Sequence, residues 1–93
     1  MKYDLILTTK FKKDYKRIKK RGYDLTLLQS IVDELLLGNP LDKKYKDHIL
    51  KGTFNSKHEC HIKPDWLLIY EISEITSSLT LISTGTHADL LEI

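Results

Sequence analysis

Residues 59–72 read ECHIKPDWLLIYEI and hold the strand pattern from which the fold is predicted. It contains two strand candidates, Glu59–Lys63 and Trp66–Ile72, which are separated by the typical turn sequence Pro64-Asp65. A third candidate, Leu79–Thr84, follows after a polar segment. The second half of the chain is therefore predicted to form antiparallel strands joined by short turns.

The first half of the chain carries one short apolar run and two helical patterns. The run Tyr3–Thr8 suits a strand. A helix is predicted over Lys10–Arg21, after the capping residue Thr9 and before a glycine. A second helix begins after the capping residue Asp24 and ends at Gly38-Asn39-Pro40. Because only about three residues join them, we expect the helices to form an antiparallel hairpin.

The order of these elements is β-α-α-β-β-β. It predicts an α+β fold, in which a curved antiparallel sheet carries the helical hairpin on one face. The sequence shows no internal repeat or linker-like stretch, so we expect a single domain over residues 1–93. The polar segment Lys43–Lys51 is interpreted as a loop, and His87–Leu91 as one turn of helix at most.

Composition and charge exclude several classes of protein. The single cysteine, Cys60, excludes an intramolecular disulfide framework and suits a reducing cytosol. No apolar run is long enough to span a bilayer or to serve as a signal-peptide core, so we expect a cytoplasmic protein without membrane contact. The positive charge is concentrated in Lys10–Arg21, opposed there only by Asp14. This run is either a solvated helix face or a surface for phosphates or an acidic protein.

The histidines lie in the second half of the chain, at His48, His58, His61 and His87. Alternation along the strand candidate at 59–63 puts Cys60 and Ile62 on the core face and Glu59, His61 and Lys63 on the other. Cys60 is therefore expected to be a small core residue rather than a nucleophile. The same alternation points Cys60 away from His61, which argues against a zinc site, and we expect no bound metal.

A metal-independent ribonuclease needs two proton transfers. The attacking 2′-hydroxyl must lose a proton, and the departing 5′-oxygen must gain one. Histidine suits both transfers because its reference pKa of about 6.5 lets it accept or donate a proton near neutral pH. A carboxylate such as Asp65 either acts as the base itself or orients a histidine. Composition alone favours the simpler interpretation that the histidines are surface residues without a catalytic role.

Three motifs resemble those of one protein family. Residues 45–52, YKDHILKG, resemble its YKDHxLxG loop, and residues 61–70, HIKPDWLLIY, its HxxPDWxLIY strand pair. Residues 84–87, TGTH, resemble its TG[TS]H ending. The motifs occur in the order and spacing of the YafQ-like branch of the RelE/ParE superfamily of type II toxin–antitoxin toxins. The similarity spans essentially the whole chain.

The resemblance implies a RelE-like fold and an endoribonuclease that cuts mRNA, usually on the ribosome, without a metal or organic cofactor. It implies a cognate antitoxin and ribosome-bound mRNA as partners, and operator DNA only through the antitoxin. The Lys10–Arg21 run suits contact with the antitoxin or with ribosomal RNA. Four residues fall in the implied active site. His87 is the general acid, and Asp65 with His48 or His61 is the base or its orienter.

The resemblance also bears on RNA binding. Trp66 matches a family position near the site, where an exposed indole would stack on an mRNA base. A Trp66 packed against the sheet is an equal alternative. Lys51 and Lys63 are expected to contact RNA.

Two positions depart from the family pattern. Ser83 and His58 stand where many relatives carry an arginine, whose forked donor suits phosphate. This departure favours an alternative function, a catalytically weak protein that acts mainly as an antitoxin-binding partner and co-repressor. A third hypothesis is a small RNA-binding domain without chemistry.

Overall fold

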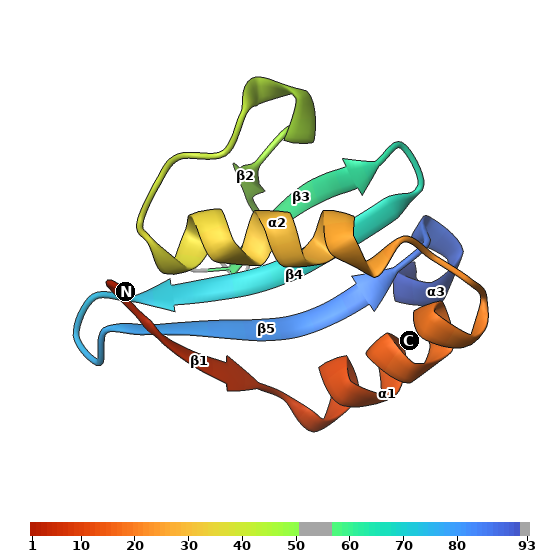
Figure 1. The fold of residues 1–93 in the computed structure, drawn as a ribbon, viewed down its shortest axis with the longest axis horizontal. Coiled ribbons are helices and arrows are strands. Elements are labelled where there is room, and N and C mark those ends of the chain that lie inside the picture. The colour runs from red at the N-terminus through yellow and green to blue at the C-terminus, as the bar shows by residue number, and fades with distance from the viewer. Residues whose placement is uncertain (51–56, 92–93) are drawn as a thin grey trace.

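The structure of this chain, a computed structural model, describes residues 1–50 and 57–91 (Figure 1). Its helices and strands are β1 (Asp4–Leu7), α1 (Thr9–Lys20), α2 (Leu25–Leu36), a 3₁₀ turn η1 (Lys43–Tyr45), β2 (His48–Ile49), β3 (Lys57–Lys63), β4 (Trp66–Ser73), β5 (Ser78–Gly85) and α3 (His87–Leu91). In these ranges no helix is long and apolar enough to cross a membrane.

The five strands form one sheet in the order β1-β5-β4-β3-β2. Strands β2 to β5 pair with their neighbours in antiparallel fashion, whereas β1 runs parallel to β5, with Asp4 opposite Ser78. The α+β class and the predicted order of elements are confirmed. The prediction of a wholly antiparallel sheet is wrong for β1. Two helices and three strands separate β1 from β5 along the chain, and its direction relative to β5 depends on that long connection rather than on local sequence.

The segment predicted as a loop, Lys43–Lys51, contains two regular elements. It forms the 3₁₀ turn η1 and then the short strand β2, in which His48 lies opposite Glu59 and Ile49 opposite His58. The loop prediction is therefore wrong for His48 and Ile49. A strand of two residues is too short to produce a detectable alternation. Lys51, predicted to contact RNA, lies outside the described residues.

Both helices begin at side-chain caps and pack on the same side of the sheet. Thr8, rather than the predicted Thr9, caps α1 by accepting a hydrogen bond from the Phe11 amide at 2.9 Å. Asp24 caps α2 as predicted, through the Thr26 amide at 3.1 Å. In Figure 1, α2 crosses in front of the sheet, and α1 lies along β5 beyond the end of β1.

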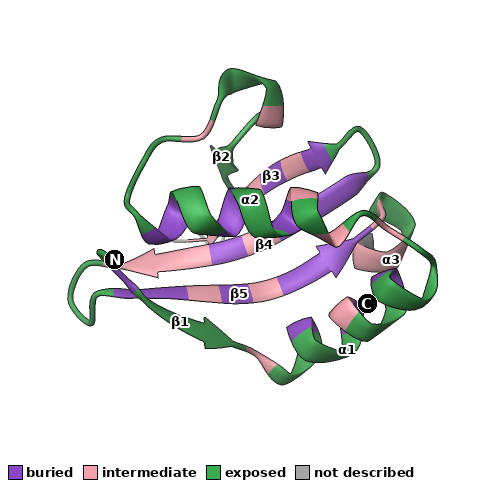
Figure 2. Ribbon diagram, in the orientation of Figure 1, coloured by how far each residue is buried: buried purple, intermediate pink, exposed green. Residues whose placement is uncertain are grey.

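The core lies between the helices and the sheet (Figure 2). It includes apolar side chains from α2 and from the facing side of β3, β4 and β5, such as Ile31, Leu68 and Leu79. Cys60 is fully buried in this layer, and burial raises the pKa of its thiol to about 12. The thiol therefore stays protonated at neutral pH, in agreement with its expected role as a core residue.

Candidate active site

Four residues that the sequence singles out come together at one end of the sheet. His48 lies on β2 and His61 on β3, Asp65 is in the turn after β3, and His87 begins α3. The ring of His61 has its centroid 5.7 Å from that of His87 and 6.3 Å from that of His48. The four side chains all remain accessible to solvent, so a polymer such as RNA can reach this cluster.

Asp65 and His87 form a directly bonded pair. The Asp65 Oδ1 atom accepts hydrogen bonds from the backbone amide of His87 at 2.9 Å and from its ring Nδ1 at 2.6 Å. These donors, the amide first, lower the pKa of the Asp65 carboxyl below its usual range. The carboxylate is therefore ionised at neutral pH and holds a proton on Nδ1 of His87. This arrangement directs Nε2 of His87 away from Asp65.

The helix that carries His87 is fixed by a second carboxylate, Asp89. Its side chain accepts a hydrogen bond from the Thr86 amide at 3.0 Å, while its own amide donates to Thr86 Oγ1 at the same distance. Arg21, the C-cap residue of α1, binds Asp89 through two nitrogens, at 2.6 and 3.1 Å, and keeps the pKa of that carboxyl well below its usual range. The contact ties α3 to α1 and limits the movement of His87.

Glu59 also belongs to the site, although the sequence patterns did not indicate a role for it. Its Oε1 atom lies 3.4 Å from Nε2 of His48 and 3.9 Å from Nε2 of His61. The Nδ1 atom of His48 donates to the carbonyl oxygen of Lys46 at 2.8 Å, which directs the other nitrogen toward Glu59. The signal was present in the predicted alternation, which put Glu59 and His61 on the same face. The site thus holds two carboxylates, each beside imidazole nitrogens.

Three lysine side chains border a cavity beside His61. A cavity of about 450 Å³ is bordered by Lys44, Lys46 and Lys63 together with His61. Lys63, predicted to contact RNA, also borders a second cavity of about 520 Å³ that includes Asp65. Lys44 and Lys46 were not predicted, because they lie in the segment interpreted as a loop. The lysines give the site a positive rim beside its proton-transfer groups.

Trp66 is a core residue and not an exposed stacking platform. Its side chain is only 3% exposed, its indole Nε1 donates to Thr84 Oγ1 at 3.0 Å, and its ring meets that of Tyr23 edge-on at 4.9 Å. The interpretation of Trp66 as an RNA-stacking residue is therefore corrected to the packed alternative. Stacking requires an accessible ring face, and these contacts cover it.

The two positions that depart from the family pattern both make structural contacts. Ser83 is buried and donates to Asp14 of α1 at 2.6 Å. His58 lies on the core side of β3, where its ring stacks on Tyr70 and its Nδ1 atom is 3.3 Å from Asp47 Oδ1. In the ranges 1–50 and 57–91, no group of three or more His, Cys, Asp or Glu side chains is arranged to hold a metal ion.

The chain is similar to known proteins over nearly its whole length. A family model described as bacterial toxin of type II toxin-antitoxin system, YafQ, matches residues 3–92. The chain is 37% identical over 89 residues to the mRNA interferase toxin YafQ of Escherichia coli (strain K12), covering 94% of each chain.

Two solved structures resemble the fold closely. The toxin in the E. coli DinJ-YafQ complex superposes with a TM-score of 0.89 at 34% identity, covering 96% of this chain and 98% of that one. A metal-bound toxin from Helicobacter pylori superposes with a TM-score of 0.90 at 43% identity, covering 96% and 99%.

Proposed function

The chain belongs to the YafQ family of bacterial toxins of type II toxin–antitoxin systems, and we therefore propose that its histidine–carboxylate cluster cleaves mRNA on the ribosome. The protein is a toxin and an mRNA interferase, that is, an endoribonuclease. Its partner is a cognate antitoxin, as in the DinJ-YafQ complex of the E. coli relative.

One observation carries the proposed mechanism, namely the two separate carboxylate–imidazole groups of the site. Asp65 is engaged with His87, so His87 serves as the acid that protonates the departing 5′-oxygen. Glu59 stands beside His48 and His61, so one of these imidazoles takes the proton of the 2′-hydroxyl. Asp65 then acts as the orienter of His87 rather than as the base.

The charge on the pentavalent phosphate requires cationic donors. Lys63 and Lys46 border the cavity at His61 and are proposed to fill this role together with the protonated imidazoles. The alternative of a catalytically weak co-repressor depended on Ser83 and His58. Ser83 bonds to Asp14 and His58 lies beside Asp47, so structural contacts account for both residues. The residues found at these positions therefore do not favour the co-repressor alternative.

The chemistry of the cut ends tests this mechanism. Attack by the 2′-hydroxyl leaves a 2′,3′-cyclic phosphate on one fragment and a 5′-hydroxyl on the other. We expect purified protein to cut mRNA on programmed ribosomes, with much weaker cutting of the same free mRNA. The new 5′ ends should accept phosphate from polynucleotide kinase without prior phosphatase treatment. New 5′ ends that already carry phosphate would contradict the proposed mechanism.

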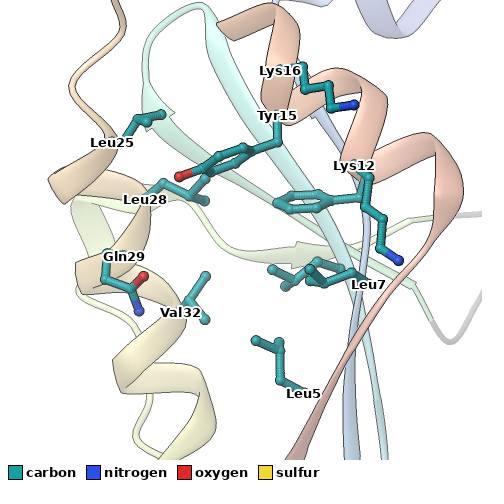
Figure 3. Close-up of a pocket in the computed structure, with 11 residues that line it drawn as sticks. Leu5, Leu7, Lys12, Tyr15, Lys16, Leu25, Leu28, Gln29 and Val32 are labelled. Atoms are coloured by element: carbon teal, nitrogen blue, oxygen red, sulfur yellow. The ribbon is translucent and has the colours of Figure 1, made fainter. Parts of the chain in front are cut away.

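We further propose that the antitoxin occupies an apolar groove between α1, α2 and β1 (Figure 3). The groove has a volume of about 450 Å³, and its apolar lining is Leu5 and Leu7 of β1, Phe11 and Tyr15 of α1, Leu25, Leu28 and Val32 of α2, and Leu81 of β5. Leu5 and Leu7 are 45% and 38% exposed on an edge strand of the sheet. An exposed apolar edge of this kind is typical of a surface that another chain covers.

The positive charge at the groove indicates which kind of antitoxin segment would bind there. Lys12 and Lys16 of α1 line the same groove, and their amino groups extend from the helix beside the apolar residues (Figure 3). The groove therefore fits an apolar antitoxin segment with acidic side chains facing α1. Other cations of the basic run are engaged within the chain, because Lys10 and Arg17 approach Asp14 and Arg21 binds Asp89. The exposed lysines remain the proposed contact with ribosomal RNA when no antitoxin is bound.

Substitution of an exposed groove residue tests this assignment. We expect Leu5→Glu to weaken antitoxin binding by about tenfold or more, because the charge would lie in an apolar contact beside an acidic segment. The measurement is titration calorimetry with the purified antitoxin. Ile75→Glu is the matched control, since Ile75 is 96% exposed in the turn between β4 and β5 and should leave the affinity unchanged. Equal affinities for the two variants would contradict the groove assignment.

A further inference from the structure

A second cluster of polar side chains lies on the opposite side of the sheet from His61. Tyr70 of β4 is buried, and its hydroxyl donates to Asp47 Oδ1 at 2.6 Å. His58 of β3 stacks on Tyr70, with ring centroids 5.0 Å apart and an interplanar angle of 18°. Its Nδ1 atom lies 3.3 Å from the same Asp47 oxygen. Asp47 thus joins two side chains of the sheet to the segment before β2.

The segment leads into His48, the first residue of β2, and the residue after β2 is held by a hydrogen bond from the Leu50 amide to the Lys57 carbonyl oxygen at 2.8 Å. β2 contains only two residues, and its pairing with β3 spans only His48 and Ile49. Lys46, just before Asp47, has a left-handed backbone with φ of 50°. Residues in this conformation persist only where surrounding contacts fix them. The bonds of Asp47 supply such contacts one residue away from His48.

We propose that Asp47, Tyr70 and His58 are positioning residues that fix His48 against Glu59 on the proton-accepting side of the site. This inference rests on the proposed function, because it assumes that His48 takes part in the cleavage. We call these three residues the anchor. The anchor acts on His48 through the backbone, since Asp47 and His48 are neighbours in sequence and their side chains contact opposite faces of the sheet.

The protonation of Tyr70 agrees with this role. Burial, followed by the neighbouring Asp47 carboxylate, raises the pKa of Tyr70 well above its usual value. The hydroxyl therefore remains a donor over the whole physiological pH range. An arginine in place of His58 would also present a donor to Asp47. His58 thus makes the contact to Asp47 that an arginine would make, with an imidazole in place of a guanidinium group.

Removal of one hydroxyl tests the anchor with little change in packing. We expect Tyr70→Phe to lower the single-turnover rate of mRNA cleavage on ribosomes by about 10- to 100-fold, because small misplacements of a reacting group cost this much. The affinity for ribosomes should be unchanged. Tyr3→Phe is the matched control, because the Tyr3 hydroxyl also donates to a carboxylate, that of Glu74, and should leave the rate unchanged.

Two further measurements separate positioning from general stability. In Tyr70→Phe, the NMR chemical shifts of the His48 imidazole should move toward the values of a histidine in a flexible peptide. The chemical shifts of the His87 imidazole should not change. His58→Arg should keep at least a third of the parental rate, whereas His58→Ala should lose about tenfold. Unchanged His48 resonances together with the parental rate in Tyr70→Phe would overturn the inference. If the parent protein itself does not cleave mRNA, the proposed function fails, while the His48 resonances still report on the anchor.

Discussion

His87→Ala is expected to lower the rate of mRNA cleavage by about 10²- to 10⁴-fold, the usual contribution of a positioned general acid. The ring is the group that contacts both Asp65 and the His61 imidazole, so its removal leaves the 5′-oxygen to depart without a proton. The side chain is half exposed at the start of α3, and truncation therefore creates no cavity in the core. The measurement is the single-turnover cleavage of mRNA on purified ribosomes.

Two controls make this result specific. The variant should unfold at the parental temperature and bind the antitoxin with the parental affinity, because the proposed groove lies on α1, α2 and β1. Its expression without the antitoxin should no longer arrest growth. Cleavage by His87→Ala within threefold of the parental rate would remove His87 from the mechanism.

The second large effect is expected on stability, from Asp14→Ala. Asp14 is 1% exposed, and its Oδ2 atom accepts hydrogen bonds from Ser83 Oγ at 2.6 Å and from the backbone amide of Thr84 at 3.2 Å. Alanine leaves both donors buried without an acceptor, at about 1–3 kcal/mol each. The free energy of unfolding should fall by about 3–5 kcal/mol, which corresponds to about 12–25 °C in Tm for a domain of this size.

Thermal unfolding followed by the fluorescence of Trp66 measures this change. Asp33→Ala is the matched control, because Asp33 is an exposed helical aspartate whose side chain accepts one hydrogen bond, from Gln29 at 2.8 Å. Its substitution should change the free energy of unfolding by less than about 0.5 kcal/mol. An Asp14→Ala protein that unfolds within a few degrees of the parent would show that the buried carboxylate is not needed to join α1 to β5.

The elements that local patterns determine were predictable from the sequence. Apolar spacing and the Asp24 cap predicted both helices, and alternation correctly put Cys60 on the buried face of β3. The partner of β1 was not predictable, because strand pairing joins residues more than seventy positions apart. β2 was missed because two residues carry no periodicity.

The site was predictable to a similar extent. The motifs selected four residues that the fold does bring together, and their catalytic roles remain predictions. Glu59 was placed on the correct face but given no role, since its closeness to His48 depends on the pairing of β2 with β3. The exposure of Trp66 depends on Tyr23 and Thr84, which come from other elements. A single sequence does not reveal such contacts.

The parallel pairing of β1 with β5 has a consequence for biosynthesis. The first strand leaves the ribosome long before residues 78–81, its partners, have been translated. A nascent chain therefore cannot close its sheet before β5 has been made, and His87, which follows β5, joins the cluster only after that point.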